Sequence, residues 1–211
     1  MLTDRSVSLP YGKIALMVEG MPSADSHERT FTERARRQQL IGVTIEQVAQ
    51  RGFAGASLAR IAEAAGITKA AVLYHFGSKD ALVTAAHAEI LESLVATVGE
   101  ALEGAAVADR PSTYIRTMVA HFRDHPQHAR VLAAAGTQEG FDHAREDRWA
   151  PLSGLLDAAA HARGDDAPAA DSRALAVLIG GAIDGIVAEH LEDPTFDTDA
   201  AAAILVAMLP D

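Results

Sequence analysis

Residues 58–82 read LARIAEAAGITKAAVLYHFGSKDAL, and this stretch is the part of the sequence most informative about the fold. Its apolar residues recur at helical spacing on both sides of Gly66, a residue type that often ends helices because it tolerates left-handed backbone. Thr68 and Ser78 precede the next two segments, and their hydroxyls are suited to accept the free N–H groups of a helix start. The stretch therefore predicts two short helices joined by a tight turn, a helix-turn-helix, followed by a third helix.

Apolar residues keep the same spacing outside this stretch. Upstream, residues 33–50 form a predicted helix that ends at Gly52, and Ser57 is placed to cap the helix that follows. Downstream, helices are expected over residues 79–104, 112–124, 126–135, 139–163 with a perturbation at Pro151, 171–192 and 198–209. The sequence thus predicts an all-α protein of about nine helices, with an N-terminal three-helix helix-turn-helix domain and a C-terminal helical domain.

The composition narrows the class of protein. The 211 residues are 49% hydrophobic and include no cysteine, which excludes disulfides, thiolate metal sites and a cysteine nucleophile. The longest apolar run near the N-terminus, residues 14–18, is shorter than a signal-peptide core of about 7–15 residues. We therefore expect a cytoplasmic protein without a membrane partner. Residues 1–29 are expected to be a disordered arm or, alternatively, the result of a start codon assigned ahead of Met21.

Charge is distributed unevenly along the chain. The formal net charge is -11, yet residues 33–82 carry seven basic and four acidic side chains, a net of +3. Residues 83–211 carry eight basic and twenty-one acidic side chains, a net of -13. The N-terminal domain is therefore suited to a polyanion, whereas the C-terminal domain would repel one.

The region from Arg34 to about Ala85 resembles the DNA-binding domain of the TetR family of transcriptional repressors. The resemblance rests on RGFAGASLARIAEAAG, ITKAAVLYHF and GSKDAL, which follow one another in the family's order and spacing. It implies a DNA-binding domain over residues 30–82 and a ligand-binding and dimerisation domain over residues 83–211. The expected DNA-contacting residues are Ser57, Thr68, Lys69, Ala70, Ala71, Tyr74, His75 and Lys79.

The expected contacts follow from seating residues 69–76 in a major groove. Lys69 is expected to donate to guanine, and an alanine methyl to touch a thymine methyl, while Tyr74 and the other later residues face phosphates. Two alternatives remain, in which the Tyr74 ring covers the domain core and His75 is a partly buried histidine. Leu73 stands where many family members have a tyrosine, and Ala59 stands where some have a base-reading arginine. Because Lys69 is then the main long side chain for reading bases, DNA shape is expected to carry part of the specificity.

Residues 171–192 include three glycines, Gly180, Gly181 and Gly185, and each costs a helix about 1 kcal/mol relative to alanine. A close helix–helix approach would offset this cost, and the resemblance implies that the last two long helices form a dimer interface. Ordinary packing within one chain is the alternative. The residues expected in the interface or its adjacent core are Leu175, Leu178, Ile179, Ala182, Ile186, Ile204, Leu205 and Met208.

The resemblance also implies that a small molecule binds among the central helices and moves the two DNA-reading helices out of register. The candidate ligand-binding residues are His87, Leu91, Leu94, Met118, His121, Phe122, Trp149 and Asp184. Because most of them are apolar, they suit a lipophilic effector, although each is also compatible with a place in the core. Asp184 is alternatively a hydrogen-bonding residue of the dimer interface.

His121, His125 and His128 follow one another at a spacing typical of metal ligands. Pro126 breaks the helix that would place them on one face, so we expect solvated or capping histidines and no metal site. No cofactor is expected either. The chain has no Gly-rich phosphate loop, no G-x-S-x-G and no paired His/Glu motif, and this argues against an enzyme.

The resemblance to the TetR family, together with these patterns, implies a ligand-responsive transcriptional repressor. Its expected partners are a near-palindromic double-stranded DNA operator, a small-molecule effector that releases it, and a second copy of the chain in a homodimer. Two alternatives remain open, a helix-turn-helix protein-interaction module that does not bind DNA and a metal-responsive repressor.

Overall fold

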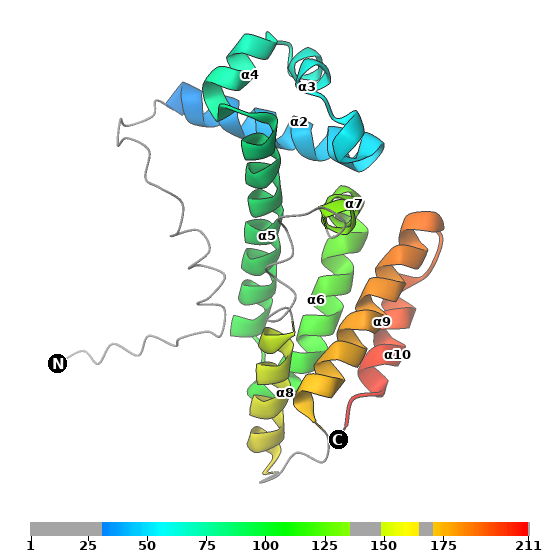
Figure 1. The fold of residues 1–211 in the computed structure, drawn as a ribbon. Helices are drawn as coiled ribbons and strands as arrows, with labels where there is room; N and C mark the ends of the chain where they lie inside the picture. Colours follow the sequence, from blue (N-terminus) through cyan, green and yellow to red (C-terminus); the bar gives the residue numbers. More distant parts are fainter. Residues whose placement is uncertain (1–30, 136–148, 165–170, 211) are drawn as a thin grey trace, which may run out of the picture.

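The computed structural model describes residues 31–135, 149–164 and 171–210. Within these ranges the chain forms nine α-helices, one short 3-10 helix and no strand (Figure 1). The helices are α2 (Phe31–Gly55), α3 (Leu58–Ala64), α4 (Lys69–Phe76), α5 (Lys79–Glu103), α6 (Arg110–Asp124), α7 (Pro126–Ala135), α8 (Ala150–Arg163), α9 (Ser172–Glu192) and α10 (Thr198–Ala207), with the 3-10 helix η1 (Val107–Asp109) before α6. The all-α prediction is confirmed.

The helix boundaries in the N-terminal part follow the caps and glycines of the sequence. The side chains of Ser57, Thr68 and Ser78 each accept a hydrogen bond from a backbone N–H three residues further on, at 3.3, 3.1 and 3.0 Å. Gly66 and Gly77 have φ values of 67° and 74°, which side-chain-bearing residues rarely adopt. The helix-turn-helix therefore has the boundaries expected from its sequence.

The α2 helix differs from its prediction at one end. Helical structure runs to Gly55, but Gly52 has φ 67° and ψ 174° and interrupts it. The predicted stop thus exists as a kink, beyond which Phe53 turns its ring into the core and is only 9% exposed.

The first hydrophobic core joins the helix-turn-helix to the top of the C-terminal part. Leu40, Ile61, Val72, Leu82 and Ile90 are completely buried in it and come from four helices, α2 to α5. Val131 of α7 belongs to the same core and is 1% exposed. Packing therefore links α7 directly to the DNA-reading end of the molecule.

A second core holds the remaining helices together as a bundle. Ile115, Leu152, Ala176 and Ala202 are buried in it, one from each of α6, α8, α9 and α10. The α5 helix crosses residue 82, where we expected the domain boundary, without a break, and it reaches the bundle through Val98 and Leu102. In Figure 1 this helix extends from the α2–α4 end down to α8.

Two predictions lie wholly or partly outside the described residues. They are the N-terminal arm and residues 139–148 of the helix expected to end at Arg163. The described part of that helix is α8, in which Pro151 stands in the first turn, where no intrahelical N–H partner is lost. By length and composition α5 and α9 are apolar enough to cross a membrane, but both also pack within the helical bundle.

Candidate DNA-binding surface

The α4 helix has one buried edge and one exposed edge. Val72 is completely buried and Phe76 packs against the same core, whereas Thr68, Lys69 and Ala70 are exposed. Tyr74 is 77% exposed, and its ring meets that of His75 edge-to-face at 5.3 Å. The Tyr74 ring therefore does not cover the domain core, and its hydroxyl is available to a partner.

The other predicted DNA contacts are less exposed. Ser57, Ala71, His75 and Lys79 are half-buried. The Lys79 ammonium donates a hydrogen bond to the backbone carbonyl of Phe53, which ties the start of α5 to the end of α2. Because an ammonium group has three N–H donors, this bond leaves two for another acceptor.

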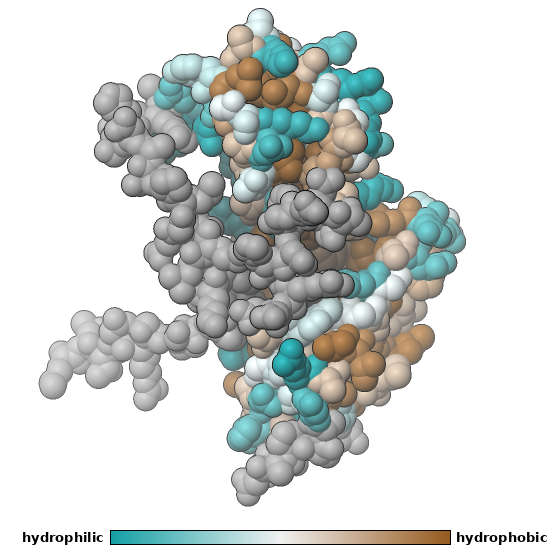
Figure 2. Space-filling model, in the orientation of Figure 1, coloured by the Kyte–Doolittle hydropathy of each residue, from teal (hydrophilic) through white to brown (hydrophobic). Residues whose placement is uncertain are grey.

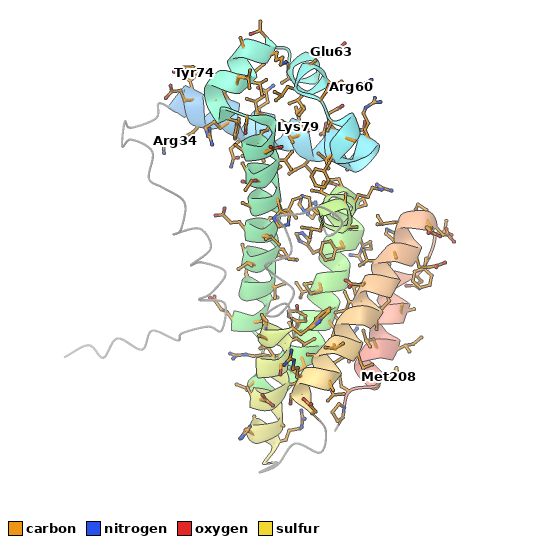
Figure 3. All side chains as sticks on the ribbon, in the orientation of Figure 1. Arg34, Arg60, Glu63, Tyr74, Lys79 and Met208 are labelled. Atoms are coloured by element: carbon orange, nitrogen blue, oxygen red, sulfur yellow. The ribbon has the colours of Figure 1, made fainter. Side chains whose placement is uncertain are left out.

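Two further arginines lie at the same end of the molecule, and the sequence reasoning did not single them out. Arg34 on α2 and Arg60 on α3 are exposed, and Figure 3 places both around the helix-turn-helix with Tyr74 and Lys79. The acidic Glu63 lies near Arg60 on α3. The local net charge of +3 was the available signal for these arginines.

An apolar face covers α9 and α10. Leu178, Ile204 and Met208 are 69%, 66% and 74% exposed, and Val177 is 44% exposed. Hydrophobic side chains gather at the lower right of Figure 2, where Figure 1 places α9. Three of the predicted interface residues therefore lie on an exposed surface, and Val177 extends it.

The other predicted interface residues lie further inside. Ile179 and Leu205 are 5% and 8% exposed and form part of the second core. The prediction allowed each residue of this set to lie either in the interface or in the adjacent core. Leu175, Ala182 and Ile186 are half-buried and pack against that core.

The three glycines of α9 do not share one role. A Cβ atom on Gly180 would lie 1.7 Å from Cζ3 of Trp149, so the indole packs directly on this glycine. A Cβ atom on Gly181 or Gly185 would meet nothing within 4 Å. Packing within the chain therefore explains Gly180, whereas Gly181 and Gly185 lie on the open side of the helix.

The predicted ligand-binding residues are only partly brought together. Leu94 and Met118 pack against a small cluster that includes Leu155, between α5, α6 and α8. The other members of the set are spread over the bundle: Phe122 and His121 are buried, His87, Leu91 and Trp149 are half-buried, and Asp184 is exposed on α9. Burial lowers the pKa of His87.

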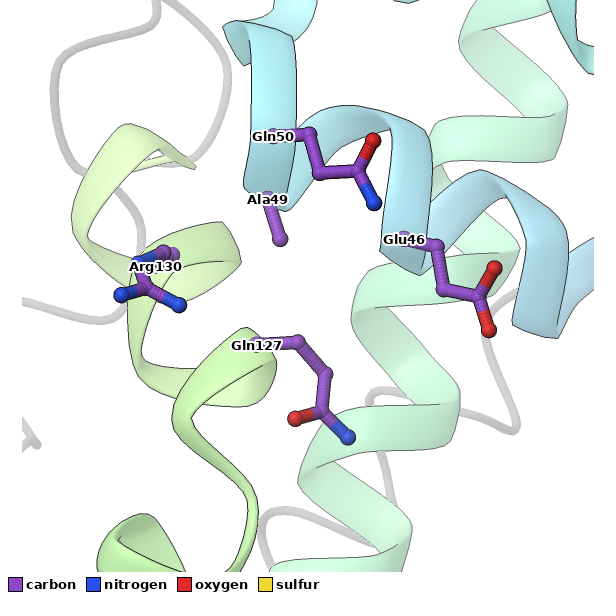
Figure 4. Close-up of a pocket in the computed structure, with 5 residues that line it drawn as sticks. All are labelled: Glu46, Ala49, Gln50, Gln127 and Arg130. Atoms are coloured by element: carbon purple, nitrogen blue, oxygen red, sulfur yellow. The ribbon is translucent and has the colours of Figure 1, made fainter.

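A polar groove lies between α2 and α7. Figure 4 shows the five residues that line it, which are Glu46, Ala49, Gln50, Gln127 and Arg130. None of them was a predicted ligand-binding residue. The groove joins the two helices whose apolar sides share the first core.

The predicted break of the helix at Pro126 is confirmed, but it does not keep the three histidines apart. The α6 helix ends at Asp124 and α7 starts at Pro126, but the ring centroids of His121, His125 and His128 lie 4.9–5.3 Å apart. Nε2 of His121 lies 3.2 Å from Nδ1 of His128. The turn between the helices is tight enough to bring the three rings into contact although the helix is interrupted, and the rings of His125 and His128 are stacked.

His121 is also buried, at 4% exposure, rather than solvated. Burial, together with the neighbouring His128 and His125, lowers the pKa of His121 to about 4. Among the residues that the structure describes, no group of three histidine, aspartate or glutamate side chains is arranged to hold a metal ion. The cluster is therefore a set of closely packed rings of which His121 is the buried member.

The sequence of the helix-turn-helix region is similar to those of known regulatory proteins. Residues 40–86, which hold α3, α4 and the start of α5, match the sequence model of bacterial regulatory proteins of the tetR family. The HTH-type transcriptional regulator RutR of Escherichia coli strain K12 is 33% identical over 105 residues, which make up 50% of this chain and 50% of RutR. The chain thus spans about half the length of the curated relatives it matches.

Solved structures resemble a larger part of the chain. A TetR-like transcriptional regulator from Rhodococcus sp. RHA1 has a TM-score of 0.68 at 22% identity, over 81% of this chain and 91% of that one. The regulator FadR from Bacillus subtilis, solved in complex with stearoyl-CoA, has a TM-score of 0.68 at 18% identity, over 82% of this chain and 99% of its own. At these identities the likeness concerns the fold.

Proposed function

We propose that this chain is a TetR-family repressor that binds a near-palindromic operator as a homodimer, because residues 40–86 match the sequence model of the tetR family. A small lipophilic effector releases it. The observation that carries the proposal is the exposure of Lys69, in the first turn of α4, and of Tyr74, on the side of α4 away from the buried Val72. A helix so oriented has its polar edge free to enter a major groove about 12 Å wide.

Each residue on this edge has a chemical role in the proposal. Lys69, in the first turn of α4, donates to O6 or N7 of a guanine, and the methyl of Ala70 or Ala71 touches a thymine. Tyr74 and His75 donate to phosphate oxygens, as do Thr68 and Ser57. The two remaining N–H donors of Lys79 serve the same purpose at the start of α5, where the helix dipole favours an anion.

The exposed face of α9 and α10 supports the homodimer. Large exposed apolar patches commonly mark interaction sites, and Leu178, Ile204 and Met208 form one here. A twofold dimer places two recognition helices about 34–36 Å apart, on successive turns of an operator. Residues 83–211 thus act as the dimerisation and effector domain and residues 30–82 as the DNA-binding domain, with α5 shared between them.

The effector is proposed to be lipophilic because the candidate residues between α5, α6 and α8 are apolar. Leu94 and Met118 line this region, and the similarly folded FadR of Bacillus subtilis holds stearoyl-CoA. Release requires only that the effector and the operator prefer different conformations of the protein. As a regulator of transcription, the protein acts in the cytoplasm and has no catalytic role in this account.

Fluorescence-anisotropy titration tests the function. The purified protein is titrated against the DNA upstream of its own gene and against a scrambled duplex, at two salt concentrations. We expect tight, salt-sensitive binding to the first duplex and weak binding to the second. Equal weak binding to both, repeated with fragments from the rest of the genome, would favour a protein-interaction module instead.

A further inference from the structure

We infer that Arg37, on α2, is a positioning residue that holds the recognition helix α4 at the angle needed to read bases. The inference rests on the proposed function, since it concerns how selectively the protein binds DNA. It assigns to Arg37 no contact with DNA.

Arg37 contacts the end of α4 in two ways. Its guanidinium donates a hydrogen bond to the backbone carbonyl of His75, in the last turn of α4. Its Cζ atom also lies 4.0 Å from the centroid of the Phe76 ring, which is a cation–π arrangement. The last carbonyls of a helix have no partner within the helix and carry the negative end of its dipole, so a fixed cation is favourable there.

The α4 helix has few other restraints on its angle. It is eight residues long, and Val72 is its one fully buried residue. Glycines with positive φ, Gly66 and Gly77, stand in the turns on either side of it. Because the planar guanidinium fixes both the carbonyl and the ring, it restrains the tilt and the rotation of α4 together.

The neighbouring Gln39 serves the other helix of the motif in a similar way. Its Nε2 donates to the backbone carbonyl of Ala65, the C-cap of α3, at 3.4 Å. Side chains of α2 therefore hold the carbonyl ends of both α3 and α4. Of the two contacts, the one made by Arg37 is the stronger, since it combines a charged donor with an aromatic ring.

A loose α4 would affect base contacts more than phosphate contacts. His75 lies six positions after Lys69, which is roughly 9 Å along a helix, so a tilt at the His75 end is carried to the base-reading end. Hydrogen bonds to base edges tolerate only a few tenths of an ångström, whereas flexible side chains can follow a phosphate. Loss of Arg37 should therefore lower affinity for the operator more than affinity for unrelated DNA.

The test compares Arg37→Met with Arg34→Met, a matched change of an exposed arginine one turn earlier on the same helix. Both variants are checked for folding by circular dichroism and titrated against operator and scrambled duplexes over a range of salt concentrations. For Arg37→Met we expect operator affinity to fall about ten-fold, scrambled-duplex affinity to change less than two-fold, and the salt slope to stay the same. Arg34→Met should keep the wild-type ratio of the two affinities.

Two results would overturn the inference. A folded Arg37→Met protein with the wild-type ratio would show that the contact does not position α4. An equal loss on both duplexes, with the salt slope reduced by about one, would make Arg37 a phosphate contact instead. If wild-type protein itself fails to distinguish the duplexes, the proposed function fails as well, so the two failures are distinguishable.

Two milder variants decide the question if Arg37→Met does not fold. Arg37→Lys keeps a cation but loses the planar fork, and Phe76→Leu removes the ring while it keeps an apolar side chain. Each should lower the ratio of operator to scrambled affinity about three-fold, since each removes part of the contact. The wild-type ratio in both variants would contradict the positioning role.

Discussion

The molecule exposes two faces of opposite chemistry at its two ends. The edge of α4 carries Lys69 and Tyr74 in a region of positive net charge, whereas the face of α9 and α10 carries Leu178 and Met208 in a region of strongly negative net charge. The first face suits a polyanion, and the apolar second face is the one on which we propose that a second copy of the chain packs. The net charge of -11 for the whole chain therefore describes neither surface.

The largest effect is expected from placing a charge on the apolar face. Leu178→Glu would bury a carboxylate between two copies of α9, and this should dissociate the dimer. Because two linked sites bind far more tightly than one, operator affinity should fall at least about a hundred-fold. Sedimentation velocity and anisotropy measure the two effects.

Val107→Glu is the control for this change, since Val107 is another exposed apolar residue, at 39% exposure, but lies on η1 away from the face. It should leave the dimer and the affinity unchanged. A Leu178→Glu protein that remained dimeric would show that the copies meet elsewhere.

Substitution of two lysines on the polar face separates base contacts from phosphate contacts. Lys69→Ala should lower operator affinity about ten-fold and relax the preference at one base pair, because it removes a base contact. Lys79→Ala should weaken binding to all duplexes alike and reduce the salt slope by about one. Titration against a set of duplexes with single substitutions separates the two patterns, and identical patterns would contradict the division into base and phosphate contacts.

Alanine substitutions at two glycines compare the packed side of α9 with its open side. Gly180→Ala should lower the free energy of unfolding by about 1–3 kcal/mol, because its Cβ would collide with Trp149. Gly181→Ala should raise it by up to about 1 kcal/mol, since alanine favours the helix and nothing lies near its Cβ. Urea unfolding in the Leu178→Glu background measures both without a contribution from the dimer, and a destabilising Gly181→Ala would contradict the open side of the helix.

The smallest effect concerns the histidines at the junction of α6 and α7. The folded-state pKa of His121 is about 4, below its ordinary value of 6.5, so the unfolded chain binds the proton more readily. Stability from this group is therefore complete above pH 6.5 and is lost as the pH falls towards 4. His121→Gln should flatten the pH dependence of urea unfolding in this window, and an unchanged dependence would mean that other groups cause it.

Local features of the sequence were sufficient for the fold and for one of the two faces. The caps at Ser57, Thr68 and Ser78 act within three residues of chain, so spacing alone predicts them. The exposed edge of α4 follows in the same way from the buried position of Val72. Short-range hydrogen bonds and helical periodicity need no knowledge of the tertiary arrangement.

Contacts between distant parts of the chain were not predictable in this way. Arg37 and the His75 carbonyl are 38 residues apart, and any basic residue on α2 was an equal candidate for that contact. The packing of Trp149 on Gly180 and the close approach of His121 to His128 depend on how helices turn back on one another. Such contacts follow from the packed arrangement of the helices, which periodicity does not specify.

The most direct test of the account is the composition of the complex with DNA. Sedimentation equilibrium of the protein with the duplex from upstream of its own gene measures how many chains bind and whether the free protein is already paired. The account predicts a free dimer and two chains on each operator, with no comparable complex on a scrambled duplex. A monomer that binds both duplexes alike would contradict it.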